Sequence, residues 1–310
     1  MTRIHLDTDL GSDTDDLCAL VMLLGWPDVE ITGITTVTDP GGVRAGMVAY
    51  ALELAGRGDI PVTAGAEASI GGLYVPLAFP DHWPVTIDPR PSPPGAALEL
   101  LARSVENNDT VVAIGPYTNL AMFEAARPGA LAAGTLVTMG GHVPPPGAGL
   151  PPWGMSDDFN VQQDAVAARV VFERCEPLVV PVGTSLRATL RERHLPALRT
   201  SGALGRLLAE QGVAHADENG RRSLPAVYPA LPSDLLNFQY DALACAAAAG
   251  WDGITIDDVP VKLSDDAGLL RMERVPEAPA LRIVTDADAD RFEQVWLEAA
   301  VRASSRGPTT

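Results

Sequence analysis

Five aspartates crowd into ten consecutive residues near the start of the chain. They lie in the segment Asp7-Thr8-Asp9-Leu10-Gly11-Ser12-Asp13-Thr14-Asp15-Asp16. So many neighbouring carboxylates repel one another unless a cation is bound or some of them are protonated. Carboxylate oxygens are the donors that hard cations such as Ca²⁺ and Mg²⁺ prefer. The spacing therefore predicts a divalent-cation site.

Other interpretations of this segment remain open. The acids would also suit a solvated turn in which Asp15 or Asp16 caps a helix. An EF-hand loop fits poorly, because Ser12 stands at its sixth position, where glycine is needed, and Cys18 at its twelfth, where glutamate is needed. A zinc site is disfavoured, because the five histidines are scattered and no Cys/His ligand spacing is present.

The elements around the acidic segment alternate between strand and helix patterns. Strands are expected at 3–7, 29–37, 60–63, 110–114, 136–139 and 178–182, and helices at 15–24, 43–55, 119–126 and 164–173. Further along, 187–222 and 234–250 have helical patterns, and 282–302 reads as a strand and then a helix. This rhythm predicts an α/β fold, a single open and mostly parallel twisted sheet of the Rossmann-like type with helices on both faces. Its ligands would bind at the carboxyl ends of the strands, where the acids lie.

The composition of the chain limits its possible domain organisation and the classes of partner that it could bind. We expect one domain over residues 1–310, since no linker or repeat divides the chain and 46% of it is hydrophobic. The net charge of −18 disfavours nucleic-acid and anionic-membrane partners. Cys18, Cys175 and Cys245 lie in apolar stretches and are expected to be free thiols. With no secretory signal or spanning apolar run recognised, we expect a cytoplasmic protein.

Two proline-rich stretches, 71–94 and 140–154, interrupt the strand and helix rhythm. Long irregular segments in a compact domain are often lids or binding loops, although variable surface loops are equally compatible with this composition. Four of their side chains are suited to line a pocket: His82, Trp83, His142 and Trp153.

Several motifs, taken together, resemble the inosine–uridine-type nucleoside hydrolase family. The acidic segment is similar to the longer variant of that family's opening Asp-x-Asp-x-Gly motif, and Gly115-Pro116-Tyr117-Thr118-Asn119-Leu120-Ala121 resembles its Gly-Pro-x-Thr-Asn turn. Weaker similarities follow in the family's order: Ile34-Thr35-Thr36-Val37, Asp59-Ile60-Pro61-Val62, Met139-Gly140-Gly141, Asp158-Phe159-Asn160 and Tyr240-Asp241.

The resemblance implies roles for particular residues. Asp9, Asp16 and Asp241 would bind Ca²⁺ through their side chains, and Thr118 through its backbone carbonyl. Asp9 would also act as general base toward a water. The residues expected to contact the ribose are Asp15, Asp39, Met139, Asp158 and Asn160. The resemblance also implies a homodimer or homotetramer with a place in nucleoside salvage.

Most of these residues also have an ordinary structural interpretation. Thr118 would suit a helix cap, Met139 a core position, and Asp158 or Asn160 a turn. Asp241 is harder to explain in this way, because a carboxylate within an apolar helix needs a partner.

Two departures from the family pattern bear on the substrate. Tyr240 stands where the family's acid histidine is expected, so its hydroxyl would donate a proton or its ring would stack on the base. With Asp39 where many members carry asparagine, this favours purine nucleosides, with Trp83 and Trp153 completing the base pocket. The usual 5′-side glutamate is the shorter Asp158, so the 5′ end of the substrate is open to modification.

Two competing functions remain. A haloacid-dehalogenase-like Mg²⁺ phosphatase would use Asp7, Asp9, Thr118 and Lys262 with Asp265-Asp266, but Leu10-Gly11-Ser12 does not suit its nucleophile loop. The other is a family member that binds Ca²⁺ and a riboside without turnover, as the missing histidine would suggest.

Overall fold

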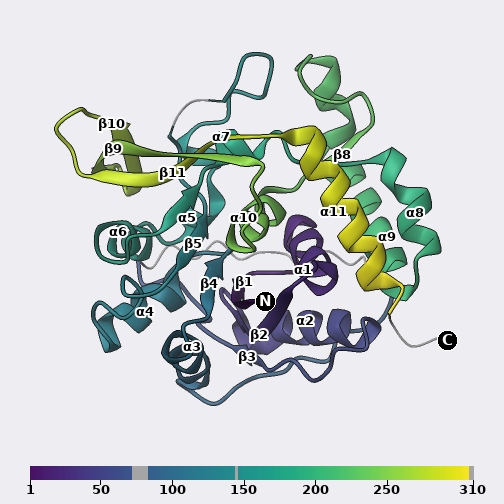
Figure 1. The fold of residues 1–310 in the computed structure, drawn as a ribbon, viewed down its shortest axis with the longest axis horizontal. Coiled ribbons are helices and arrows are strands. Elements are labelled where there is room, and N and C mark those ends of the chain that lie inside the picture. The colour runs from purple at the N-terminus through teal and green to yellow at the C-terminus, as the bar shows by residue number, and fades with distance from the viewer. Residues whose placement is uncertain (72–82, 144–145, 307–310) are drawn as a thin grey trace.

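The computed structural model describes residues 1–71, 83–143 and 146–306. Its centre is a sheet of nine strands in the order β10-β9-β11-β6-β5-β4-β1-β2-β3 (Figure 1). The parallel part comprises β1 (Thr2–Thr8), β2 (Val29–Thr36), β3 (Val62–Ala64), β4 (Thr110–Ala113), β5 (Leu136–Met139) and β6 (Leu178–Val180). Strand β11 (Ala280–Ala287) pairs parallel to β6. The predicted mostly parallel α/β sheet is confirmed.

Helices cover both faces of the sheet because its side chains alternate between two cores. On β4, Val112 packs into one core with α1 (Asp15–Gly25), whereas Val111 packs into the other with α3 (Ala96–Glu106). The first core also takes α2 (Val43–Leu54), α8 (Leu195–Thr200), α9 (Ala203–Glu218), α10 (Tyr240–Ala248) and α11 (Ala289–Ser304). The second takes α4 (Thr118–Ala126) and α6 (Ala165–Arg174). Because successive side chains point to opposite faces, a strand buried on both sides is apolar at consecutive positions, as at Val111 and Val112.

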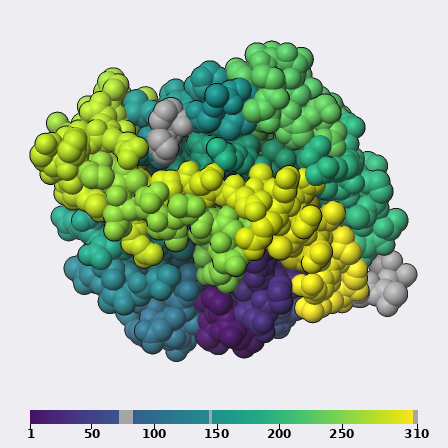
Figure 2. Space-filling model, turned by 45° about the horizontal axis from the view of Figure 1, so that its top comes forward, coloured from purple at the N-terminus to yellow at the C-terminus, as the bar shows by residue number. Residues whose placement is uncertain are grey.

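The two ends of the described chain lie side by side. Helix α11 packs against α1, and the Trp296 indole donates a hydrogen bond of 3.2 Å to the Cys18 carbonyl. Gly25 permits this approach, since a Cβ there would lie 1.9 Å from the Ala299 carbonyl oxygen. Figure 2 shows the C-terminal residues in yellow beside the N-terminal ones in purple. Helix α10 also packs against α1, which brings residues 241 and 15–16 together.

Some elements differ from the sequence expectations. An antiparallel arm made of β9 (Ile254–Asp266), β10 (Leu269–Arg274) and β11 extends the sheet (Figure 1). The stretch expected to be helical from 187 includes the short strand β7 (Thr189–Arg191), which pairs with β8 (Leu235–Phe238). Long-range pairing overrides the local helical pattern at β7, whereas no element had been expected where β9 and β10 form.

The remaining short elements are α5 (Phe159–Gln163) and α7 (Val182–Ser185), with the 3₁₀ turns η1 (Pro40–Gly42), η2 (Met155–Asp157), η3 (Glu192–His194) and η4 (Arg221–Ala226). Within the described residues, no helix has the length and apolar character needed to cross a bilayer.

Candidate active site

A cavity of about 450 Å³ opens at the carboxyl ends of the central strands. Asp9 follows β1, Ile114 follows β4, Met139 ends β5 and Val182 follows β6. The rest of its wall is formed by Ser12, Asp13, Asp15, Asp16, Trp153, Asp157, Asp158, Phe159, Asn160, His215, Asn219, Arg221, Tyr240 and Asp241. The cavity therefore lies where open parallel sheets generally bind their ligands.

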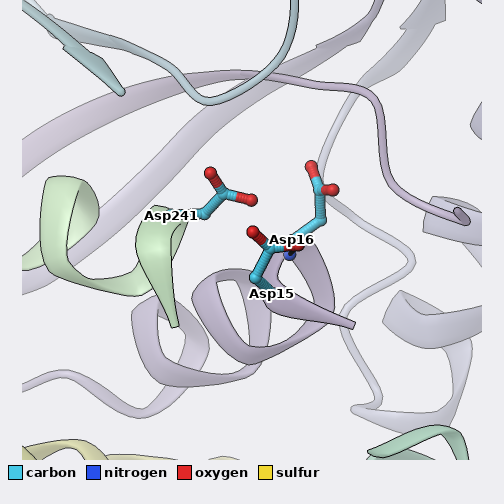
Figure 3. A group of neighbouring side chains, drawn as sticks. All are labelled: Asp15, Asp16 and Asp241. Carbon is cyan, nitrogen blue, oxygen red and sulfur yellow. Dashed lines mark hydrogen bonds between the residues drawn. The ribbon is translucent and has the colours of Figure 1, made fainter. Parts of the chain in front are cut away.

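Three buried carboxylates converge in this cavity. Asp15 and Asp16 begin α1, Asp241 lies in the first turn of α10, and one oxygen from each falls within 4.8 Å of the others. Figure 3 shows them converging from these two helices. The sequence separation is bridged by the packing of α1 against α10. Asp16 and Asp241, two of the three side chains expected to bind the cation, thus lie together. The third, Asp9, lines the same cavity but is not part of the trio, and Asp15, expected at the ribose, takes its place there.

Burial makes these groups hold their protons tightly. It raises the pKa of Asp15, Asp16 and Asp241 well above the usual carboxyl range, and their mutual repulsion adds to the rise. Burial also raises the pKa of Asp9, where the positive charge of Arg44 opposes the rise. Without a further positive charge, several carboxylates so close together are therefore not all ionised.

The donor set fits a hard divalent cation. All three acids are buried, and Oδ1 of Asp241 has no hydrogen-bond partner within the described chain. A buried carboxylate oxygen without a donor is costly unless another positive group faces it. Oxygen donors of this kind suit Ca²⁺ or Mg²⁺, whereas no histidine or cysteine belongs to the trio.

Hydrogen bonds with the surrounding backbone fix two of the residues that were predicted to contact the sugar. Asp158 accepts hydrogen bonds from the backbone amides of Gly141 and Val161, and burial raises its pKa to about 6. Asn160 donates through Nδ2 to the carbonyl of Ile114 at 2.8 Å. The Asn160 amide is therefore oriented, and its Oδ1 remains available as an acceptor.

An aromatic cluster forms another part of the wall. The Tyr240 ring lies 6.5 Å from Trp153 and 5.4 Å from Phe238, and the guanidinium of Arg221 lies 5.1 Å above the Trp153 ring. Burial raises the pKa of Tyr240 well above its usual value. This hydroxyl is therefore a poorer acid at neutral pH than an exposed tyrosine.

Charged residues of the wall include two that sequence analysis missed. His215 of α9 lies 3.3 Å from the Asp13 carboxylate, and Arg221 of η4 lies 3.8 Å from it. Asp13 also accepts a hydrogen bond from Asn237. Their 187–222 stretch carries no local motif, so only the packing of α9 and η4 against the acidic loop reveals them.

Three predicted site residues lie away from the cavity wall. Asp39 is buried and accepts hydrogen bonds from the backbone amides of Arg44 and Ala45 and from the Thr36 hydroxyl, so its carboxylate is used at the start of α2. Trp83 lines a small neighbouring hollow and packs edge-on against Tyr50, with ring centroids 6.1 Å apart.

Thr118 is the third predicted site residue that lies away from the cavity wall. It begins α4, and its hydroxyl donates to Asp164 at 2.7 Å. The residue after β4 that lines the cavity is Ile114, whose carbonyl is held by Asn160. Ile114, and not Thr118, therefore lines the cavity, because Thr118 already belongs to the first turn of α4.

The other residues proposed from the sequence either do not line the cavity or lie outside the described residues. His142 is not among the lining residues, and His82 lies outside the described residues. Lys262 and the Asp265-Asp266 pair lie on β9 in the arm, away from the acidic loop of the cavity wall, which contradicts the phosphatase alternative.

A family model and individual relatives, compared with this sequence, agree on the family. The family model of the inosine-uridine preferring nucleoside hydrolase matches residues 4–294. The chain is 32% identical over 207 residues to the pyrimidine-specific ribonucleoside hydrolase RihA of Klebsiella pneumoniae, covering 63% of each protein. It is equally identical over 190 residues to RihA of Salmonella agona, covering 57% of this chain and 58% of that protein. The matched regions thus span about three-fifths of these relatives.

Solved structures share the fold. A plant nucleoside hydrolase superposes with a TM-score of 0.78 at 21% identity, covering 97% of this chain and 99% of that one. A purine-preferring ribonucleoside hydrolase from Gardnerella vaginalis gives a TM-score of 0.77 at 18% identity, covering 98% and 99%. Because the family model matches nearly the whole length of the chain, the chain belongs to the inosine-uridine preferring nucleoside hydrolase family.

Proposed function

We propose that this protein hydrolyses the N-glycosidic bond of a ribonucleoside, releasing the free base and ribose. The observation that carries the proposal is the buried trio Asp15, Asp16 and Asp241 in a cavity of about 450 Å³, within the fold of a nucleoside hydrolase family. A cavity of this size suits a ligand of nucleoside dimensions.

Asp9, Asp16 and Asp241 would hold one Ca²⁺ ion, with the Ile114 carbonyl in the place expected for Thr118. When bound, the ion lowers the pKa of a water and provides a charge that fixes the hydroxyls of the sugar. The raised pKa values of Asp9, Asp16 and Asp241 support this assignment, because a cation would allow these carboxyls to ionise.

The chain's own residues orient the sugar and move the proton. Asp9 would accept a proton as the water oxygen bonds to C1′. Asp15 and the free Oδ1 of Asn160 would accept hydrogen bonds from ribose hydroxyls, while Met139 packs against the ring. The C1′–N bond breaks through an oxocarbenium-like transition state with its electron pair going to the base, which takes up a proton from solvent water to leave as the free base.

The base would lie against the aromatic cluster. Tyr240 and Trp153 offer ring faces on which a purine stacks, which supports the proposed preference for purine nucleosides. The relatives divide on this point, since RihA is named pyrimidine-specific and the Gardnerella vaginalis enzyme purine-preferring.

The test is a panel of purine, pyrimidine and nicotinamide ribosides, scored for free ribose in the presence of Ca²⁺. We expect turnover with at least one nucleoside, faster for purines, and loss of activity in Asp9→Ala. An enzyme that binds Ca²⁺ and ribose but releases ribose from none of them would support the binding-only alternative and overturn the proposal.

The proposed setting is nucleoside salvage in the cytoplasm by a homodimer or homotetramer. Sedimentation of the purified protein measures the subunit number, and a monomer at all concentrations would contradict the assembly.

A further inference from the structure

Arg44 is a fully buried cation directly beneath the carboxylate cluster. It lies in the first turn of α2 with no exposed surface, and its Nη2 is 3.7 Å from Oδ2 of Asp9. Its charge also acts on Asp16, whose pKa it lowers against the larger effect of burial. A guanidinium is costly to bury, so a buried one generally has its position and charge fixed by its surroundings.

The guanidinium is held by the loops that form the site. Nε donates to the Thr38 carbonyl at 2.9 Å, and Nη2 donates to the Ser12 hydroxyl at 3.0 Å. Thr38 adopts a left-handed backbone with φ of 51°, which β-branched residues rarely adopt. Arg44 therefore links the acidic loop to the turn before α2.

The helix that carries Arg44 is itself fixed at its start. Asp39 accepts hydrogen bonds from the Arg44 and Ala45 amides at 2.7 and 3.0 Å. On its outer side, a Cβ at Gly46 would lie 2.3 Å from the Asp88 carbonyl oxygen, so the chain there is packed against α2. Both contacts limit movement of the guanidinium away from Asp9.

We infer that Arg44 is a positioning residue that sets how tightly the site holds its cation. Its fixed positive charge holds Oδ2 of Asp9 in place and partly neutralises the metal-free carboxylate cluster. The same charge weakens binding of the divalent ion. This inference rests on the proposed function, because it takes the cluster as the metal site. Its physical basis is Coulombic. A fixed positive charge close to Asp9 repels a divalent ion bound by the same carboxylate, in surroundings that screen less than water.

The test is calorimetric titration of Ca²⁺ alone into the metal-stripped full chain. Arg44→Met keeps the apolar stem and removes the charge, and it should bind Ca²⁺ roughly tenfold more tightly or better. Arg44→Lys keeps the charge and should stay within about threefold of the wild type. Ser12→Ala removes one hydrogen bond but no charge, and it should also stay within about threefold.

A thermal scan gives the second readout. The metal-free Arg44→Met protein should unfold at a lower temperature than the wild type, and Ca²⁺ should remove most of that difference. If this variant does not fold without metal, it is purified in Ca²⁺ and its affinity is measured by competition with a chelator.

An Arg44→Met affinity equal to or weaker than that of the wild type overturns the inference, as does an equal change in Arg44→Lys. Failure of the proposed function gives a different pattern. The Ca²⁺ affinities would then differ as described, but the wild type would release no ribose from any nucleoside. A wild type that binds no Ca²⁺ contradicts both.

Discussion

Tyr240 belongs to the aromatic cluster and lines the same cavity as the carboxylate trio, and two chemical roles are open to it. Its ring packs beside Trp153 and Phe238, whereas burial raises the pKa of its hydroxyl well above the usual value. A group this far from neutral pH is poorly matched to general-acid catalysis. The packing therefore favours stacking on the base.

Replacing Tyr240 separates these roles. Tyr240→Phe keeps the ring and should retain kcat/KM within about threefold, whereas Tyr240→Ala should lose tenfold or more because the stacking surface is removed. Both are measured by ribose release from a purine nucleoside. A loss in Tyr240→Phe as large as that in Tyr240→Ala would show that the hydroxyl is needed.

At the scale of single residues, the sequence predicted those site residues whose type alone suggests a chemical role. Asp15, Asp16 and Asp241 converge as a carboxylate site, and their types indicated it because acids at a strand end or within an apolar helix need a positive partner. Arg44 and His215 were not found, since an arginine or a histidine within a helical pattern looks like a surface residue until the helix is placed.

At the scale of elements, the start of α2 illustrates how a site-like residue can serve the fold. Asp39 follows the second strand, a position from which a ribose contact was expected, but its oxygens accept hydrogen bonds from Thr36, Arg44 and Ala45. An acid at a helix start is stabilised by the amides exposed there.

Removing this cap tests which role Asp39 has. Asp39→Ala should lower the free energy of unfolding by about 1–3 kcal/mol, because buried amides and a hydroxyl lose their acceptor. The KM for the nucleoside should stay within about threefold. Asp59→Ala removes an exposed carboxylate paired with Arg57 and should cost under about 1 kcal/mol.

The two measurements are denaturant unfolding and steady-state kinetics on the same preparations. If Asp39→Ala raised KM tenfold or more and left stability unchanged, the result would show that Asp39 contacts the sugar.

Elements with a strong local pattern were predictable, and those made by distant pairing were not. The apolar strands β1, β2, β4 and β5 and helix α1 lie close to their expected ranges. A strand was expected from residue 282, where β11 runs, but β9 and β10 were missed, because they are partly exposed and carry many charged residues. Ile114 was overlooked as well, since the family turn alone does not show which residue near it lines the cavity.

At the scale of the whole molecule, the cluster makes stability depend on both metal and pH. Burial raises the pKa of Asp7 to about 7 and that of Asp15, Asp16 and Asp241 above the usual range. A group whose pKa is higher in the folded state contributes stability that is present at low pH and is lost as the pH rises through the folded pKa.

The metal-free protein should therefore lose stability as the pH rises from about pH 4, near the unfolded carboxyl pKa, to about pH 7, the folded pKa of Asp7. His5 offsets part of this loss, because burial lowers its pKa to about 4 and its contribution to stability therefore grows up to its unfolded pKa of about 6.5. Bound Ca²⁺ favours the ionised carboxylates, so the gain in Tm on adding Ca²⁺ should be larger at the higher pH.

Scanning calorimetry at both pH values, with and without Ca²⁺, measures this gain. Mg²⁺ at equal concentration is the control for charge alone, and it should stabilise less if the site prefers the larger ion. An equal gain at both pH values would mean that protons and the metal do not compete for these carboxylates.

The central claim is that carboxylates from both ends of the chain hold one divalent cation on which cleavage of the nucleoside depends. Its most direct test is ribose release by the metal-stripped enzyme as Ca²⁺ is added back. We predict no turnover in excess chelator, recovery that saturates at one Ca²⁺ per chain, and no recovery in Asp241→Asn at that concentration. Full turnover by the stripped enzyme in excess chelator would contradict the account.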